Sequence, residues 1–336
     1  MPSMQIAFWV VVMLVALALL FDFMNGFHDA ANSIATVVST GVLKPTQAVA
    51  FAAFFNVVAL FVFQLKVAAT VGKGIVEPGI VDQHVIFGAL VGAIAWNVIT
   101  WWYGIPSSSS HALIGGIVGA TIAKTGIGPL IGTGVLRTVA FIFISPLLGF
   151  LFGSLLMVVT AWICRRSSPL RVDKFFRRAQ LVSAGLYSLG HGGNDAQKTI
   201  GIIWLLLIAA GITTEGAKSP PGWVIWSCYF AIGLGTLLGG WRIVKTMGQR
   251  ITKLKPVGGF CAETGGAMTL FLATGLGVPV STTHTITGAI YGVGSVRSIS
   301  AVRWGLAANI LLAWVFTIPA TAFIAAVCYV LSSWLI

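Results

Sequence analysis

Long apolar runs separated by short polar stretches make up most of this chain, and a run of about 20 apolar residues is enough to cross a bilayer as a helix. In the first half the pattern predicts helices over about 6–42, 45–65, 85–102, 111–124 and 135–163. In the second half it predicts helices over about 179–211, 221–241, 257–274 and 284–294, and a final apolar stretch that reaches the C-terminus.

The most polar stretch inside these runs is 190–201, which reads GHGGNDAQKTIG. Charged groups at membrane depth are costly, so they usually face a protein interior and mark an ion or substrate path. The glycines predict a break in the helix before Asn194, and Asp195 is a good N-cap for the half that follows. We therefore expect a helix interrupted in the middle of the membrane.

A second copy of this stretch stands near the start of the chain, at 25–34, which reads NGFHDAANSI. When Asp29 is aligned with Asp195, the neighbouring polar positions also align, namely Asn25 with His191, His28 with Asn194, Asn32 with Lys198 and Ser33 with Thr199. Residues three and four apart share one helix face. Each copy therefore predicts a polar stripe on an apolar helix, again with a break, here at 25–28.

Another motif also occurs twice, as GIPSSSSH at 104–111 and as GVPVSTTH at 277–284. Each copy places Pro and several hydroxyls at the start of a short helix. Two motifs that recur in the same order predict an internal repeat. We divide the chain into a first membrane repeat at 1–164, a basic cytoplasmic linker at 165–178 and a second membrane repeat at 179–336.

The start of a helix presents unpaired N–H groups and a partial positive charge, which suits an oxyanion such as phosphate or sulfate. Neutral hydroxyls add hydrogen-bond donors without making binding too tight for release. The alternative is that the hydroxyls only cap the helices or satisfy nearby backbone groups. The predicted oxyanion-binding residues are Ser108, Ser109, Ser110, Ser281, Thr282 and Thr283, together with Asn32 and Lys198 from the polar stripes.

The composition supports a membrane protein, because 57% of the residues are hydrophobic and only 8% are charged. Soluble domains carry about a quarter charged residues. The net charge of +12 is concentrated at 165–178 and 242–255. Such clusters are typical of cytoplasmic loops under the positive-inside rule, rather than of nucleic-acid binding. With both clusters inside, the two halves have opposite topology, and we predict an all-α polytopic membrane protein with inverted repeats and broken or re-entrant helices.

The carboxylates point to coupled transport. By repeat symmetry Asp29 and Asp195 lie near the anion, which they would repel in a low-dielectric site. A positive charge must therefore accompany the anion, whether Na⁺, a proton or Lys198, and hard cations take oxygen ligands. The predicted coupling-cation residues are Asp29, Asn25, Ser33, Asn194, Asp195, Thr199 and Glu263, with Na⁺ at Asp29 and Asp195 in the case of sodium coupling.

Other roles remain open for several of these residues. Asp29 and Asp195 would serve only as N-caps in a structural reading, and Glu263 would serve only as a hydrogen-bond acceptor. Lys198 either neutralises a carboxylate or contacts the substrate. His111 and His284 fit hydrogen-bonded spacers, and proton carriage near neutral pH is the alternative.

The four motifs together resemble the PiT family of inorganic phosphate transporters. Residues 25–33 and 191–198 are similar to the duplicated Gly-Ala-Asn-Asp signature of that family, and 277–284 and 104–111 to its hydroxyl signatures. The resemblance covers essentially the whole chain. It implies phosphate uptake with Na⁺ or H⁺, an inverted-repeat fold and a homodimer. His28 stands where the signature has Asn, and Lys198 where many relatives have a small or amide residue, which leaves the coupling ion open.

The expected function is therefore a secondary active phosphate transporter, a multi-pass protein of the cytoplasmic (inner) membrane, that works by alternating access. The alternatives are a sulfate or other oxyanion symporter of the same fold, an anion channel and a membrane phosphotransferase. We predict no enzyme activity, because catalysis rarely needs two equal copies of its machinery. No Gly-x-x-x-x-Gly-Lys-[Ser/Thr] loop is present, so ATP is not expected to drive transport and no cofactor is predicted.

Overall fold

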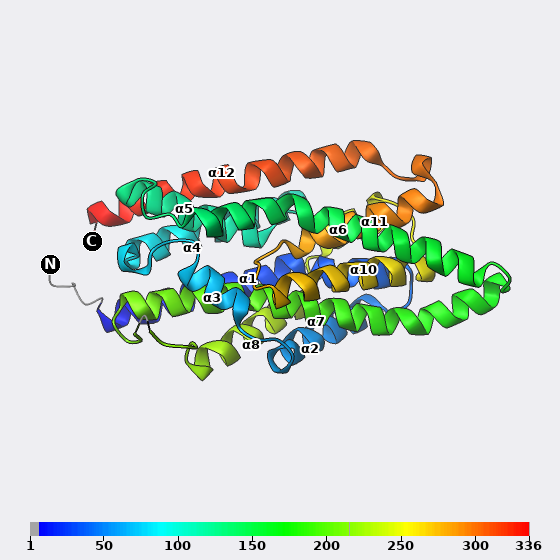
Figure 1. The fold of residues 1–336 in the computed structure, drawn as a ribbon, viewed down its shortest axis with the longest axis horizontal. Helices are drawn as coiled ribbons and strands as arrows, with labels where there is room; N and C mark the ends of the chain where they lie inside the picture. Colours follow the sequence, from blue (N-terminus) through cyan, green and yellow to red (C-terminus); the bar gives the residue numbers. More distant parts are fainter. Residues whose placement is uncertain (1–6, 215, 336) are drawn as a thin grey trace.

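The computed structural model describes residues 7–214 and 216–335, and within these ranges every regular element is a helix (Figure 1). Residues 6 and 336, the predicted limits of the first and last helices, lie outside them. The α-helices are α1 (Phe8–Ser39), α2 (Pro45–Val58), α3 (Lys66–Lys73), α4 (Gln83–Tyr103), α5 (Ser109–Thr125), α6 (Gly132–Cys164), α7 (Pro169–Ala209), α8 (Gly222–Leu238), α9 (Trp241–Lys245), α10 (Pro256–Gly275), α11 (Thr282–Arg297) and α12 (Trp304–Leu335). Short helical turns are η1 (Ala59–Phe61), η2 (Pro78–Ile80), η3 (Thr246–Arg250) and η4 (Ile299–Ala301).

Several helices are long and apolar enough to cross a membrane. Among the residues that the structure describes, four helices pass this test alone, α1, α4, α6 and α12, and two bent pairs would add two more spans. The bent pairs are α2 with α3, at 82°, and α8 with the α9 segment, at 61°. Helix α7 is longer still, at 41 residues, but carries the polar stretch 190–201 in its middle. The expectation of an all-α polytopic membrane protein is confirmed.

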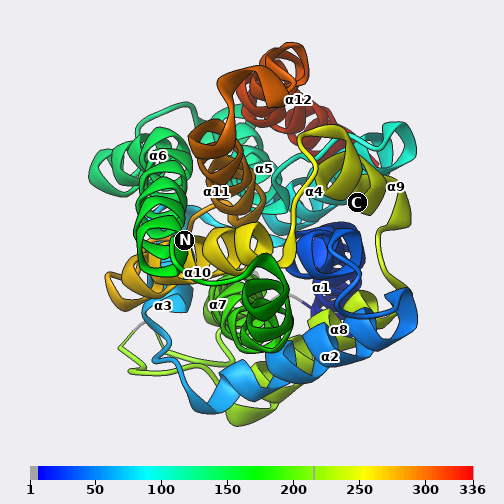
Figure 2. The ribbon, with the colours of Figure 1, turned by 90° about the vertical axis from the view of Figure 1, so that its right-hand side faces the viewer.

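Equivalent helices of the two halves run in opposite directions. Helix α1 runs from the end of the bundle that holds the N-terminus to the other end, and α7 runs back (Figure 1). The same opposition relates α6 to α12, and α5 to α11. Viewed along the bundle, α1 and α7 lie next to each other near the middle, whereas α2, α6 and α12 lie toward the rim (Figure 2). This arrangement is that of an inverted repeat.

The predicted breaks at 25–28 and 190–194 are wrong, because α1 and α7 continue as helices through both motifs. Asp195 is therefore not an N-cap and lies in the interior of α7. A glycine in a helix costs only about 1 kcal/mol relative to alanine, an amount that tertiary packing offsets. The backbone N–H groups that we expected to be free at these positions instead form hydrogen bonds within the helices.

The glycines of these motifs bring helix backbones close together. A Cβ on Gly26 would lie 2.2 Å from the carbonyl oxygen of Ile232 in α8, and one on Gly192 would lie 2.5 Å from that of Asn56 in α2. Small residues at such crossings are the usual solution for packing helices in a membrane. These glycines therefore allow neighbouring helices to pack closely, and they do not break the helices that contain them.

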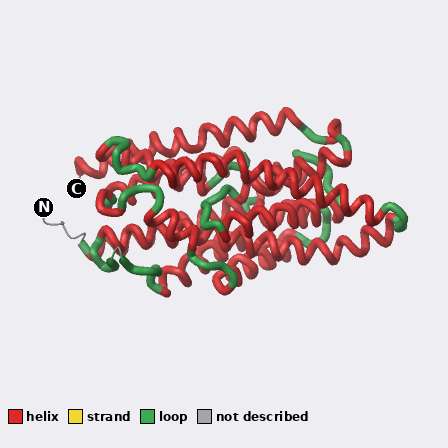
Figure 3. The backbone as a smooth tube through the Cα atoms, in the orientation of Figure 1, coloured by secondary structure: helices red, strands yellow, loops and turns green. Residues whose placement is uncertain are grey.

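The breaks in the fold occur instead at the hydroxyl motifs. Gly104 caps the end of α4, with φ 65°, and the turn after α10 contains Gly277, with φ 69°, both in the left-handed region that favours glycine. The chain then crosses the interior and starts again as α5 and α11, as predicted. Loop segments lie midway along the bundle as well as at its ends (Figure 3).

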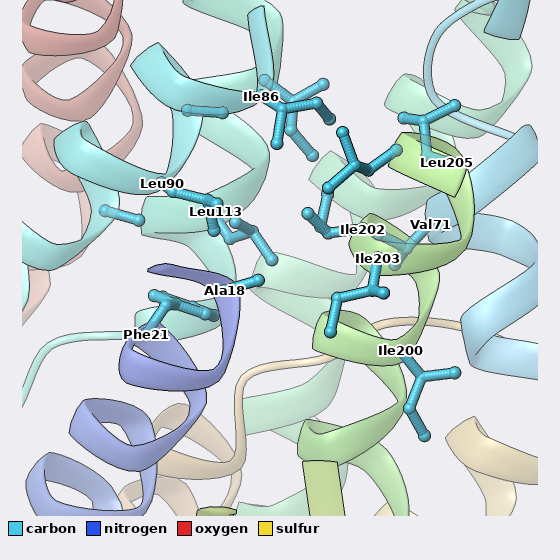
Figure 4. Packing of buried hydrophobic residues seen from close by; sticks show 14 of the residues in the cluster. Ala18, Phe21, Val71, Ile86, Leu90, Leu113, Ile200, Ile202, Ile203 and Leu205 are labelled. Carbon is cyan, nitrogen blue, oxygen red and sulfur yellow. The ribbon is translucent and has the colours of Figure 1, made fainter. Parts of the chain in front are cut away.

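Two apolar cores lie on either side of a polar layer. The first core takes Val11 to Phe21 of α1 and Ala196 to Leu207 of α7, with α4, α5 and α8 (Figure 4). The second core takes Ala31 to Val37 of α1 and packs against α10 and α11. The stretch of α1 between the two cores holds the aspartate motif. The polar site is therefore sealed between apolar layers.

The predicted basic loops lie at one end of the bundle, at the right in Figure 1. This end, which we call the basic end, contains the α6–α7 turn and the segment before α10. Helix α7 begins at Pro169, so most of the predicted linker 165–178 forms its first turns.

Candidate functional site

The two aspartate motifs meet in the centre of the molecule, where α1 and α7 are in contact with the starts of α5 and α11. Asp29 is 2% exposed and Asp195 is fully buried. All the predicted oxyanion-binding side chains are also buried, each at most 2% exposed. The site is thus closed to solvent in this conformation.

Each aspartate accepts a hydrogen bond from the hydroxyl motif of its own half. Ser109 Oγ donates to Asp29 Oδ2 at 2.9 Å. In the second half Thr282 Oγ1 donates to Asp195 Oδ2 at 3.0 Å. Ser109 and Thr282 hold the same position in the two copies of the hydroxyl motif, so the two bonds are equivalent under the repeat.

A second pair of contacts crosses between the halves. Asn32 Nδ2 donates to Thr283 Oγ1 at 2.9 Å and to Thr282 Oγ1 at 3.1 Å. At the equivalent position of α7, Lys198 Nζ donates to Ser110 Oγ. The polar stripe of each helix therefore binds the hydroxyl motif of both halves. The two halves differ in charge at this position, because Asn32 is neutral and Lys198 is cationic.

Ser108 and Ser281 are the N-caps of α5 and α11. Their Oγ atoms accept from the backbone N–H of His111, at 3.2 Å, and of His284, at 3.1 Å. Capping satisfies one of the orphan donors of each first turn. The first N–H groups of α5 and α11 have no partner within their own helix, as at any helix start.

Lys198 is the cation closest to the aspartates. Its Nζ bonds to Asp195 Oδ1 and donates to the carbonyl oxygen of Val280 at 2.7 Å. Asp29 has no lysine or arginine partner within the described part of the chain, and its Oδ1 lies 2.6 Å from His28 Nδ1. With neutral histidines, Asp29, Asp195 and Lys198 together carry a formal negative charge.

The aspartates are close enough to share one cation. Single ligand atoms of Asp29, His191 and Asp195 all lie within 4.8 Å of one another. Two further buried oxygens, Asn32 Oδ1 and Ser33 Oγ, have no hydrogen-bond partner among the described residues. Oxygen donors of this kind suit a hard cation.

Two of the predicted cation residues, Asn194 and Thr199, have partners outside the Asp29–Asp195 contact, and a third, Asn25, lies beside it. Asn194 holds the loop before α11, donating to Thr274 Oγ1 at 2.9 Å and accepting from the N–H of Val280 at 3.2 Å. Thr199 donates to Asp22 Oδ1 at 2.9 Å. Asn25 Oδ1 accepts from Ser109 Oγ at 2.5 Å and so lies beside the Asp29 contact.

Glu263 lies in a separate buried cluster nearer the basic end. Its Oε1 accepts from Thr36 Oγ1 at 2.6 Å and from Gln180 Nε2 at 2.9 Å. Its Oε2 accepts from Ser183 Oγ at 2.5 Å. The cluster joins α1, α7 and α10 around one carboxylate, and it is not part of the Asp29–Asp195 contact.

Sequence reasoning missed Asp22, which is fully buried and whose Oδ2 has no hydrogen-bond partner among the described residues. Its position seven residues before Asp29 places both on one face of α1. That spacing was the available signal. Gln180 and Ser183 were also missed, because they follow the basic first turns of α7 and belong to no motif.

His111 and His284 meet each other rather than the aspartates. Their ring centroids are 4.7 Å apart, and His284 stacks on Trp314 at 3.6 Å. Neither ring nitrogen of His111 has a hydrogen-bond partner within the described ranges, whereas the ring of His284 also approaches the backbone of Ile142. The expectation of a hydrogen-bonded spacer is therefore wrong for His111, and ring packing positions both side chains.

Comparison with known proteins gives a consistent result. The model of the phosphate transporter family matches residues 25–172 and 164–325. A protein from Rhizobium meliloti, described as "Probable low-affinity inorganic phosphate transporter", is 61% identical over 96% of this chain and 97% of its own length. A Bacillus subtilis protein with the same description is 46% identical over 97% of this chain and 98% of its own length.

A solved structure described as "The sodium-dependent phosphate transporter" superposes with a TM-score of 0.88. It is 24% identical and the match covers 98% of this chain and 100% of that one, so it supports the fold. The family match spans both aspartate motifs and both hydroxyl motifs. The chain belongs to the phosphate transporter family, a family of membrane transporters and not of enzymes.

Proposed function

We propose that this protein imports inorganic phosphate together with a cation, Na⁺ or H⁺, by alternating access. The observation that carries the proposal is the symmetric contact of Asp29 and Asp195 with the starts of α5 and α11, through Ser109 and Thr282. Each hydroxyl helix start is an anion site, and each aspartate beside it is a cation site. Anion and cation therefore bind at one centre.

The anion would be held by the starts of α5 and α11. The helix ends supply N–H donors and a partial positive charge. Ser110 and Thr283 supply hydroxyls, and Lys198 supplies a full positive charge within reach of Ser110. Because the hydroxyls of Ser108 and Ser281 cap α5 and α11, we propose that they hold these helix starts in place and do not bind the anion.

Charge balance at the site requires a cation. Phosphate beside Asp29 and Asp195 would be repelled in a low-dielectric site, and Lys198 offsets only one carboxylate. A Na⁺ ion between the aspartates, or a proton on one of them, would remove the repulsion. We place Asn32 Oδ1 and Ser33 Oγ among the oxygens available to Na⁺.

The Glu263 cluster provides oxygens for a second cation position. Thr36, Ser183 and Gln180 surround the carboxylate, and all lie on helices that also line the central site or touch it. Because this cluster lies toward the basic end, we propose that the cation passes it on leaving the central site.

Alternating access would follow from the inverted repeat. The site is closed by an apolar core on each side. Opening either core while the other stays packed would expose the site to one side of the membrane, and inverted repeats supply two such states. We take the halves as 1–164 and 179–336, with 165–178 as the connection between them.

The basic end would face the cytoplasm under the positive-inside rule. On this orientation the protein lies in the cytoplasmic membrane, and a homodimer is the assembly that we propose from its resemblance to PiT transporters. The relatives described as low-affinity inorganic phosphate transporters support phosphate as substrate, and the structure described as sodium-dependent supports Na⁺ as one coupling ion.

The test is uptake of radiolabelled phosphate into proteoliposomes with an imposed Na⁺ gradient or an imposed pH gradient. Uptake driven by either gradient, and lost in Asp195→Asn, supports the proposal. The control for loss of a carboxylate is Asp173→Asn, because Asp173 is exposed and forms a surface ion pair with Arg177. Uptake that responds to neither gradient would exclude symport. Sulfate uptake that phosphate fails to inhibit would assign a different oxyanion to the same fold.

A further inference from the structure

A basic pocket lies where α10 begins, α11 ends and α12 begins. It is a cavity of about 400 Å³ lined by Arg250, Lys253, Arg297 and Arg303, together with Ile251, Thr252 and Ser298. Arg297 is held in place, because its Nη1 donates to the carbonyl oxygen of Lys253 at 3.3 Å. The four cationic side chains are exposed at the rim of this pocket, at the basic end.

The positive charge of the basic pocket is not neutralised by the protein. None of the salt bridges found among the described residues involves its arginines or lysine. Between 242 and 336 the sequence contains one acidic residue, Glu263, which is buried with its own three donors. The pocket therefore calls for an anion from outside the chain.

An apolar slot opens from the basic pocket. This slot, of about 180 Å³, shares Thr252, Lys253 and Arg297 with the pocket, is also bordered by Lys255, and runs between α6, α10 and α11. Its apolar lining comes from Met157, Leu254, Val257, Gly258, Val293 and Gly294. An anion site that continues into an apolar slot fits an amphiphile better than a free ion.

A larger apolar groove starts beside the same pocket. Trp304, which follows Arg303 in the chain, lines one end of a cavity of about 600 Å³ between α6, α11 and α12. The rings of Trp304 and Tyr291 lie 5.7 Å apart at this end. Such aromatic residues favour the boundary between headgroups and acyl chains.

We propose that the basic pocket and its two apolar extensions bind an anionic phospholipid. The phosphate diester would lie among Arg250, Lys253, Arg297 and Arg303, one acyl chain in the slot and the other in the groove. Basic pockets between helices on the cytoplasmic side bind anionic headgroups in this way. A second copy of the chain would bring like charge, and a soluble anion would leave both apolar cavities unused.

The pocket is linked to the moving parts of the transporter. A Cβ on Gly248 would lie 2.6 Å from the carbonyl oxygen of Ala35 in α1, and Ile251 belongs to the core that packs on α1 and α11. Helix α11 begins at Thr282 in the central site and ends at Arg297 in the pocket. On the proposed transport function, bound lipid would therefore change the rate of uptake.

The binding test does not depend on transport. Purified protein in neutral detergent is titrated with phosphatidylglycerol or with phosphatidylcholine, and bound lipid and the midpoint of thermal unfolding are measured. We expect phosphatidylglycerol to raise the midpoint by several degrees and phosphatidylcholine not to. Arg297→Gln with Arg303→Gln should weaken binding at least tenfold. The matched control, Arg166→Gln with Arg171→Gln, removes equal charge from the α6–α7 region and should bind normally.

Two further arms separate lipid from a free anion. Val257→Trp fills the slot without a charge change and should weaken phosphatidylglycerol binding. Inorganic phosphate, the proposed transport substrate, should shift the midpoint equally in wild type, in Val257→Trp and in Arg297→Gln with Arg303→Gln, because it binds at the central site. Equal loss in the control double variant would overturn the proposal in favour of general surface charge. A midpoint shift with millimolar inorganic phosphate that is lost in Arg297→Gln with Arg303→Gln, together with phosphatidylglycerol binding that Val257→Trp leaves unchanged, would overturn it in favour of a free-anion site.

Discussion

Ser109 Oγ donates a 2.9 Å hydrogen bond to Asp29 Oδ2, in the centre of the bundle. The bond joins α5 to α1, two helices whose motifs lie about 80 residues apart in the chain. The equivalent bond of the second half joins Thr282 to Asp195 at 3.0 Å. The two bonds place one carboxylate at each hydroxyl helix start.

The hydroxyls that bond to the aspartates should contribute equally to phosphate binding, because they hold the starts of α5 and α11, where Ser110 and Thr283 would bind the anion. Ser109→Ala and Thr282→Val each remove a donor to a carboxylate, a bond that contributes about 1.5–3 kcal/mol. We expect each variant to raise the KM for phosphate about tenfold or more, because 1.4 kcal/mol corresponds to tenfold. Uptake against phosphate concentration measures this. Ser227→Ala, within α8, is the control, since its hydroxyl donates to the carbonyl oxygen of Val224. A normal KM in one of the two variants would contradict equivalence of the halves.

Lys198 and Asp195 should behave as a buried ion pair. Lys198→Met leaves Asp195 fully buried with its cation removed, which typically costs about 3–5 kcal/mol. The double variant Asp195→Asn with Lys198→Met should regain most of that stability and still fail to take up phosphate. Thermal unfolding and uptake on the same preparations test both statements. A stable single variant with normal uptake would show that the pair has neither role.

Thr199 should act through Asp22 and not through the coupling cation. Thr199→Val removes the donor at 2.9 Å from Asp22 Oδ1, and an unsatisfied buried acceptor costs about 1–3 kcal/mol. We expect lower stability, with the dependence of uptake on cation concentration unchanged. Asp22→Leu combined with Thr199→Val should recover the lost stability. A shift in cation dependence of Thr199→Val alone would return Thr199 to the cation site.

Changes at Glu263 should affect the dependence of uptake on cation concentration more than the KM for phosphate. Glu263→Gln keeps the size of the side chain and contacts with Thr36 and Ser183, but removes the negative charge. We expect the cation concentration for half-maximal uptake to rise about tenfold, with the KM for phosphate at saturating cation within twofold of wild type. Gln180→Ala, which removes one donor to the same carboxylate, should have a smaller effect. If the cation dependence of Glu263→Gln is normal, the cluster serves only to join α1, α7 and α10.

The position of the helix breaks was decided by packing. Gly192 and its neighbours resemble a helix break in sequence, yet α7 continues through them, and Gly192 instead makes room for the backbone of Asn56 in α2. The same applies to Gly26 against Ile232. Glycine allows both a break and a close approach, so the sequence alone does not distinguish them. By contrast, Gly104 and Gly277 precede Pro within two residues, a stronger local signal, and the chain does break there.

The assignment of partners also depended on the fold. The pattern placed Asn194 among the cation ligands, whereas it holds the loop before α11 through Thr274 and Val280. Glu263 and the aspartates looked alike as charges in apolar runs, yet they lie in separate clusters. Asp22 shares the helix face of Asp29, but only α7 shows that Thr199 is its partner. Such contacts join residues that are distant in the chain.

The sequence by itself determined the class of protein, the number of repeats and the residue types at the centre, because hydropathy and motif duplication are local properties that a bilayer constrains strongly. Only the tertiary structure decided which aspartate meets which hydroxyl, that Asn32 and Lys198 reach across to the opposite half, and that the basic residues near α11 border apolar cavities. These pairings depend on how antiparallel helices cross. The crossings are set by the packing of glycines and side chains from both halves at once.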